Sequence, residues 1–185
     1  MGRMSVPLRV RVIGDSGSGK TTFARALAGR LGLTHLELDS VFLAENWQQR
    51  DAEEARAIVR TFLDGPGAHG WVIDGNWNAK AADLLDGADT IVWLDFSRRV
   101  VMQRVVRRTL GRGITGRELW HGNREHLSSL FRRNPEDNIV LWAWVAHAKY
   151  RTEYAEWARR DARIVRLGTP RAARAWLAAS RSASS

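Results

Sequence analysis

Eight consecutive residues near the N-terminus combine the types and spacing that bind a phosphate chain. Gly14-Asp15-Ser16-Gly17-Ser18-Gly19-Lys20-Thr21 fits the pattern G-x-x-x-x-G-K-[ST] at every fixed position. Glycines let the backbone turn so that N–H groups face inward, and a following helix adds its own N–H donors. In such a loop the lysine reaches the β- and γ-phosphates, and the threonine hydroxyl is a ligand for Mg²⁺. We therefore expect the loop, with the next residue Thr22, to bind Mg-ATP.

Polar residues that follow two later apolar runs are the next candidates. Asp74 ends the run WVI, as a magnesium-holding aspartate does beside a phosphate loop. Asn76 and Trp77 come just after it and can offer a hydrogen bond and a stacking face to an acceptor, although most tryptophans belong to the core. Asp39 ends the run THLELD, where the alternative to a functional role is a turn cap.

These residues need a scaffold that brings them together, and the chain alternates short apolar runs with helical patterns five times. The expected strands are 8–13, 34–39, 71–75, 88–96 and 162–167, and the expected helices are 19–31, 51–63, 97–110, 136–157 and 171–179. Gly32 is the expected C-cap of the first helix, and Asp51 with Glu54 the capping box of the second. Because the strands are continuous apolar runs, the pattern predicts an α/β fold with a parallel sheet covered on both faces. Ligands of such folds bind at the carboxyl ends of the strands.

Composition further narrows the class of protein to which the chain can belong. The chain has 185 residues, 44% hydrophobic and 26% charged, which suits one globular domain over residues 1–185. It has no cysteine, so disulfides and thiolate metal sites are excluded. No leader-like or membrane-spanning apolar run is present, so we expect a cytoplasmic protein without membrane contact. The net charge of +9 suits an anionic partner, but a GC-rich genome that inflates arginine and alanine explains it equally well.

The stretches that carry a family likeness are GDSGSGKTTFARALAGRLGL, HLELD, WVIDGNW, ADTIVWLDFSRR and RVVRRTLGRG. Together they resemble the nucleoside-monophosphate-kinase-like P-loop group, which includes adenylate and shikimate kinases. Within that group the chain is most similar to small bacterial DNA topology modulation or adenylate-kinase-like proteins, over about residues 8–180. The resemblance implies a three-layer α/β/α P-loop NTPase fold with sheet order 2-3-1-4-5. It also implies an acceptor-binding insertion at 40–70 and a lid at 111–135, where glycines loosen the chain. The core would then consist of residues 8–39, 71–110 and 136–180. The tail 181–185 is expected to be disordered.

The resemblance also implies residue roles. Asp39 would orient an acceptor hydroxyl or a magnesium water, and Arg104 and Arg108 would meet the adenine or its phosphates. With these roles the expected catalytic residues are Lys20, Asp39, Asp74 and Arg108. The metal ion would be held by Thr21 and Asp74. The acceptor would be held by Asp39, Asn76 and Trp77. The lid arginines Arg112, Arg117 and Arg124 are further candidates for charge neutralisation. The chain departs from adenylate kinases after Asp74-Gly75, where it lacks the arginine that contacts the monophosphate.

Two functions remain open at this point. The first is a small-molecule kinase that uses ATP and Mg²⁺, with a nucleotide, a nucleoside or another small hydroxyl or phosphate compound as acceptor. The second is an ATP-dependent, nucleic-acid-linked regulator, which the positive charge and the topology label motivate. No helix-turn-helix, RRM or zinc pattern supports the second, so we favour the kinase. The sequence leaves open whether the protein is a monomer or a homodimer.

Overall fold

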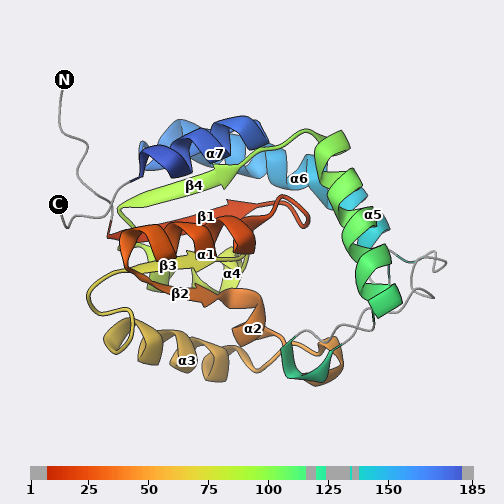
Figure 1. Ribbon diagram of the computed structural model, residues 1–185. Coiled ribbons are helices and arrows are strands. Elements are labelled where there is room, and N and C mark those ends of the chain that lie inside the picture. Colours follow the sequence, from red (N-terminus) through yellow and green to blue (C-terminus); the bar gives the residue numbers. More distant parts are fainter. Residues whose placement is uncertain (1–7, 116–119, 124–133, 135–137, 181–185) are drawn as a thin grey trace.

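The protein folds around a five-stranded sheet in which every strand pairing is parallel (Figure 1). The computed structural model describes residues 8–115, 120–123, 134 and 138–180. The strands are β1 (Arg9–Gly14), β2 (Thr34–Glu37), β3 (Trp71–Asp74), β4 (Thr90–Leu94) and β5 (Ile164–Leu167). Their order in the sheet is β2-β3-β1-β4-β5, as the sequence predicts.

Helices connect the strands and cover the sheet. The described helices are α1 (Lys20–Leu31), α2 (Leu38–Phe42), α3 (Ala52–Asp64), α4 (Asn78–Ala81), α5 (Arg98–Thr115), α6 (Ile139–Arg160) and α7 (Pro170–Ala179). Short 3₁₀ turns are η1 (Glu45–Trp47), η2 (Asp83–Leu85) and η3 (Trp120–Gly122). The caps follow local chemistry: Asp51 accepts from the amides of Glu53 and Glu54, and Gly32 ends α1 in the left-handed conformation.

Two apolar layers lie on opposite faces of the sheet. On one face, Phe23 and Leu27 of α1 and Ala173 of α7 pack against β1, β3, β4 and β5. On the other face, Val59 of α3 and Tyr154 of α6 pack against β1, β3 and β4. The prediction of an α/β fold with a covered parallel sheet is therefore confirmed.

Most predicted bounds are off by a few residues, and the differences at β2 and α5 bear on the site. Strand β2 ends at Glu37 instead of Asp39, because its pairing with β3 stops where Glu37 lies opposite Asp74, the last residue of β3. The chain turns into α2 at Leu38, so Asp39 lies on a helical turn. Helix α5 continues through Gly111 as far as Thr115, so the first residues of the predicted lid segment are helical instead of loose. The predicted tail 181–185 lies outside the described residues.

The carboxyl ends of β1, β2 and β3 meet at one edge of the sheet. Register places Glu37 beside Asp74 on the neighbouring strand, and β1 runs straight into Gly14. This edge carries the residues that the sequence singles out. Among the described residues, no helix has the length and apolar character needed to cross a bilayer.

Candidate functional site

The loop between β1 and α1 turns at three glycines with positive φ. Gly14, Gly17 and Gly19 have φ values of 146°, 87° and 88°, which side-chain-bearing residues rarely adopt. A Cβ at Gly17 would lie 2.4 Å from Val105 Cγ2 of α5, so the loop presses directly against that helix. The buried Ser18 Oγ has no hydrogen-bond partner among the described residues. The free hydroxyl and the left-handed glycines fit a phosphate chain.

Lys20 begins α1 and folds back over the loop. Its Nζ donates to the carbonyl oxygens of Gly14 at 2.9 Å and Asp15 at 3.0 Å. Loss of hydration lowers the pKa of the lysine, while the charges of Asp39, Asp74 and Asp15 act against this shift. The charges of these three carboxylates therefore favour the protonated form of the lysine.

The first turn of α1 meets β2 and β3 through one hydroxyl group. Thr21 Oγ1 lies 2.8 Å from Glu37 Oε1 and 2.8 Å from Asp74 Oδ2. A hydroxyl has one proton, so the threonine donates to only one carboxylate at a time. Burial raises the pKa of Glu37, and the hydrogen bond from Thr21 opposes that rise. The three oxygens form a polar corner beside the loop.

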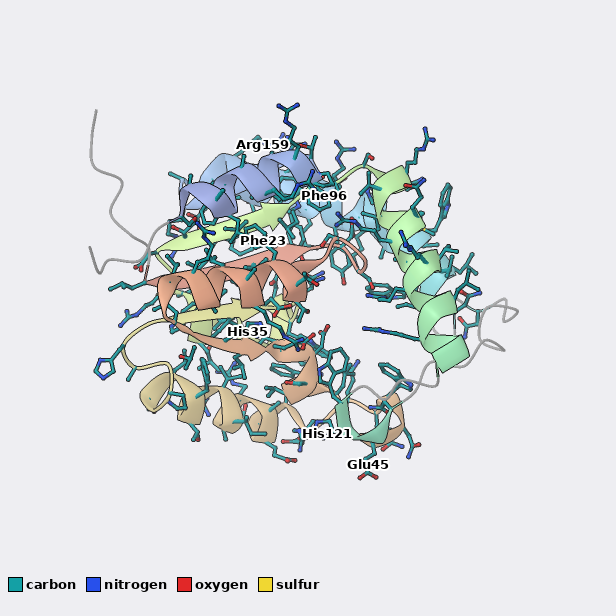
Figure 2. The ribbon with its side chains drawn as sticks, in the orientation of Figure 1. Phe23, His35, Glu45, Phe96, His121 and Arg159 are labelled. Atoms are coloured by element: carbon teal, nitrogen blue, oxygen red, sulfur yellow. The ribbon has the colours of Figure 1, made fainter. Side chains whose placement is uncertain are left out.

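Asp74 has a second partner on the neighbouring strand. His35 Nε2 of β2 lies 2.6 Å from Asp74 Oδ1, and the Asp74 side chain is 1% exposed. Figure 2 labels His35 on β2 among the side chains of the sheet. Since Oδ2 faces Thr21 while Oδ1 faces His35, the orientation of the carboxylate is fixed from both sides. His35 belongs to no motif in the sequence.

The oxygen corner of Thr21, Glu37 and Asp74 fits a hard cation such as Mg²⁺, which prefers oxygen ligands and keeps several waters. Within the described part of the chain, no group of three or more imidazole, thiol and carboxylate side chains forms a complete metal cage. A magnesium ion on a P-loop does not need such a cage, because phosphates and water supply most of its ligands. Glu37 thus joins Thr21 and Asp74 as a candidate metal-side residue.

Asn76 and Trp77 lie in the turn after β3, but both are engaged within the protein. Asn76 Nδ2 donates to the Gly14 carbonyl at 2.7 Å, and its Oδ1 accepts from the Gly14 amide at 3.4 Å. Trp77 Nε1 donates to Asp39 Oδ1 at 2.8 Å, and the indole stacks on Phe42 at 4.7 Å between ring centroids. Asn76 therefore clamps the loop to β3, and Trp77 orients Asp39.

Two arginines of α5 reach the loop from the other side. Arg104 Nη1 donates to the Ser18 carbonyl at 2.7 Å, and Arg108 Nη2 donates to Ser16 Oγ at 3.2 Å. Arg108 also lies close enough to Lys20 for its charge to lower the lysine pKa. Thr22 is exposed on the first turn of α1. Of the lid arginines, Arg117 and Arg124 lie outside the described residues.

A segment of the predicted lid lies against the predicted acceptor insertion. Asn123, 4% exposed, donates through Nδ2 to the Ala44 carbonyl at 2.8 Å, and its Oδ1 accepts from the Trp47 amide at 2.9 Å. Trp120 Nε1 donates to Glu37 Oε2 at 3.2 Å. Figure 2 shows His121 and Glu45 close together where η3 meets η1. We call residues 120–123 with 44–47 the clasp.

The backbone of the clasp is unusual. Asn46, Trp47 and His121 have positive φ values of 55°, 58° and 56°, and they are the non-glycine residues of the described chain that do. Such conformations cost energy and cluster where structure is held for function. Sequence reasoning misses Glu37, Trp120 and Asn123, because their partners are distant in the chain. Of these three residues, Glu37 alone carries a sequence signal, because it lies two residues before the end of the predicted strand 34–39.

The fold and the site together define a class. A parallel sheet of order 2-3-1-4-5, flanked by helices and carrying a glycine-rich loop after its first strand, is consistent with a P-loop kinase-like fold. The sequence matches no protein-family profile and none of the curated proteins. Among solved structures it is similar to an unliganded sugar kinase from Janibacter sp. HTCC2649, with 24% identity, a TM-score of 0.38, and coverage of 55% of this chain and 68% of that chain.

Proposed function

We propose that the protein is a small-molecule kinase that transfers the γ-phosphoryl group of Mg-ATP to a small acceptor. One observation carries the proposal: the Thr21 hydroxyl meets Asp74 and Glu37 at 2.8 Å each, directly beside the loop that Lys20 crosses. This is the arrangement that phosphoryl transfer needs, a phosphate cradle next to an oxygen-lined metal corner. In that corner, Mg²⁺ would neutralise negative charge on the phosphates.

Each site residue would have a role that follows from its position. The loop amides and Lys20 would hold the phosphate chain, and Arg104 and Arg108 would add positive charge from α5. His35 would keep Asp74 oriented toward Thr21. Asp39, on the insertion side, would face the acceptor. Positioning and charge neutralisation supply the rate, so no covalent intermediate with the protein is required.

The test compares two lysine variants of the purified protein. Lys20→Ala should abolish phosphoryl transfer and weaken Mg-ATP binding by calorimetry, because it removes the charge nearest the phosphates. Lys149→Ala is the matched control, since Lys149 is exposed on α6, and it should leave both quantities unchanged. Equal binding and turnover in Lys20→Ala and the wild type would refute the assignment.

A further inference from the structure

We propose that the protein has a second anion site, a cavity beside α6 that binds a small multivalent oxyanion such as inorganic phosphate or a phosphate monoester. We also propose that His147 connects this site to the glycine-rich loop. The inference goes beyond the proposed kinase function, because the cavity takes no part in phosphoryl transfer. It is carried by the charge of the cavity wall, by the contacts of its arginines and by the position of His147.

The cavity lies where α5 begins beside α6. The two helices pack against each other (Figure 1), and the cavity has a volume of about 630 Å³. Its wall includes Arg98 of α5 and, from α6, His147, Ala148, Arg151, Ala155 and Arg159. The residues from α6 recur at helical spacing, so they share one face of that helix. The described wall has three arginines and no carboxylate, and a space of this size accommodates a small phosphate ester.

Two of the three arginines have no hydrogen-bonded acidic partner among the described residues. Arg98 stacks on the Trp144 ring, with 4.6 Å between Cζ and the ring centroid. Stacking uses the face of the guanidinium group and leaves the N–H groups at its edge able to donate. Arg159 Nη2 lies 3.9 Å from Glu156 Oε1, both side chains are exposed, and this distance is too long for a hydrogen bond.

The third arginine shares a carboxylate with an arginine of β5. Arg151 Nε lies 3.3 Å from Asp95 Oδ1, whereas Arg166 Nε donates to Asp95 Oδ2 at 2.8 Å. One carboxylate balances one of the two guanidinium groups, so one positive charge remains beside the cavity. Three guanidinium groups in one wall can donate several N–H bonds to the same oxyanion. The wall therefore favours a small anion that carries more than one charge.

The buried His147, 3% exposed, connects the cavity wall to the loop. Its Nε2 lies 3.2 Å from the Phe96 carbonyl oxygen. A carbonyl oxygen can only accept, so Nε2 carries a hydrogen whether the ring is neutral or charged. The same nitrogen lies 3.6 Å from Oδ2 of Asp15, the second residue of the glycine-rich loop. One imidazole ring thus lines the cavity and faces a carboxylate of the loop.

Asp15 is buried and lies among charged groups from several elements. Burial raises its pKa, and the charge of Asp95 acts in the same direction. Positive charge on His147 of α6, Lys20 of α1 and Arg98 of α5 opposes that rise in the pKa. Asp15 in turn affects the pKa of Lys20, so its charge is felt where the nucleotide phosphates would bind. An ionised Asp15 beside a neutral histidine therefore opposes phosphate binding at the loop.

These contacts predict that an anion in the cavity strengthens nucleotide binding. An anion beside His147 favours the protonated imidazole, and the imidazolium balances the charge of Asp15. The loop then presents less negative charge to the nucleotide phosphates. Because such coupling is reciprocal, a bound nucleotide would strengthen anion binding by the same factor.

Calorimetry on the full chain tests the cavity with inorganic phosphate and with ribose 5-phosphate as probes. An excess of a non-hydrolysable ATP analogue with Mg²⁺ occupies the loop, so that the heat of phosphate binding reports on the second site. We expect one anion per chain with a Kd of about 1 mM or below. Tighter binding of inorganic phosphate supports a free phosphate as the ligand, and tighter binding of ribose 5-phosphate supports an ester. The absence of binding by both probes at millimolar concentration overturns the inference.

Variants of the wall locate the bound anion. Arg98→Gln and Arg151→Gln should each weaken phosphate binding about fivefold or more, whereas Arg160→Gln, exposed at the end of α6 and outside the wall, should leave it unchanged. Phosphate that binds equally well to both wall variants overturns the inference. So does duplex DNA that binds through these arginines when neither phosphate probe does. If the ATP analogue fails to bind, the proposed kinase fails, and the same titration on Lys20→Ala without nucleotide still tests the cavity.

His147→Gln tests the connection, because glutamine can donate to the Phe96 carbonyl but cannot take up a proton. Phosphate should raise the affinity of the wild type for the ATP analogue about fivefold, and should not do so in His147→Gln. The wild type should also take up more protons per phosphate bound than the variant, measured from binding heats in two buffers of different ionisation enthalpy. Equal coupling and equal proton uptake in the two proteins would refute the role of His147.

Discussion

Gly17 lies in the loop between β1 and α1 and packs directly against α5. Its φ of 87° and the 2.4 Å that would separate an added Cβ from Val105 leave no room for a side chain. Gly29, on α1, has nothing within 4 Å of its added Cβ. The two positions therefore separate the effect of an added methyl group on the loop from its effect on a helix.

We expect Gly17→Ala to destabilise the fold by more than ~1 kcal/mol and to abolish Mg-ATP binding, because the loop must move away from α5. Gly29→Ala should instead stabilise the protein by roughly 0.5–1 kcal/mol, since alanine is the better helix former. Urea unfolding and nucleotide calorimetry measure both effects. Normal ATP binding by Gly17→Ala would contradict the described loop geometry.

Asn76 is a second residue-scale test, because its side chain makes two hydrogen bonds to Gly14. Asn76→Ala removes both bonds to Gly14 and should cost about 1–3 kcal/mol of stability. Because the loop loses its link to β3, ATP affinity should fall as well, while the KM for the acceptor changes little. A variant that changes only the KM for the acceptor would return Asn76 to the substrate-contact role that the sequence predicts.

At the scale of elements, an ion pair fastens the insertion to the core. Arg56 of α3 contacts both carboxylate oxygens of Asp83 in η2, at 2.8 and 2.5 Å. This hydrogen bonding lowers the pKa of Asp83 from 3.8 to about 2. A lowered pKa in the folded state means that the ionised pair stabilises the fold above the ordinary pKa, and that this contribution is lost as pH falls toward 2.

Asp83→Asn should therefore reduce the free energy of unfolding at pH 7, by a diminishing amount from about pH 4 downward, and by only a small part of that amount near pH 2. Urea unfolding at several pH values measures the trend. The exposed Asp64, replaced in the same way, should give no such pH-dependent difference. If the free energy of unfolding of Asp83→Asn is as far below that of the wild type at pH 2 as at pH 7, the ion pair is not the cause of the difference.

The clasp is the other contact between elements that can be tested directly. Asn123→Ala removes the side chain that holds the Trp47 amide and the Ala44 carbonyl. Amide exchange over residues 44–47 should accelerate about tenfold, which corresponds to ~1.4 kcal/mol. Exchange in β1 and β4 should stay slow, because those strands lie in the core. Unchanged exchange at Trp47 would show that the clasp contributes nothing to local order.

At the scale of the whole molecule, nucleotide binding should be visible as added stability. An ATP analogue with Mg²⁺ at 100 times its dissociation constant adds about 2.7 kcal/mol. For a chain of 185 residues this corresponds to a rise in Tm of roughly 5–10 °C. Lys20→Ala should lose most of the rise. A wild-type Tm that does not respond at millimolar nucleotide would remove the basis of the kinase proposal.

The sequence predicts the sheet and the loop well because their signals are local. Apolar runs mark the strands, and one short motif gives the turn, the lysine and the threonine. The end of β2 is predicted wrongly because the alternation in LELD continues the strand pattern, whereas pairing stops with Asp74. Glycine content also predicts a break after Leu110, but Gly111 is exposed on α5, where a helix tolerates it.

The contacts that complete the site join distant parts of the chain, and for this reason they escape sequence reasoning. His35 meets Asp74 across 39 positions, and Trp120 meets Glu37 across 83. Neither residue belongs to a motif, and a histidine or a tryptophan has many ordinary roles. Spatial register, which only the folded sheet supplies, reveals these partners.

The clasp bears on the order of events in a catalytic cycle. Ala44 and Trp47 are bonded to Asn123 above the carboxylates, and Trp120 contacts Glu37 from the same segment. In the proposed kinase, an acceptor would enter before these bonds form, and its phosphorylated product would depart after they break. Product release would then be rate-limiting for turnover. A burst of product in the first cycle would precede a slower steady-state rate.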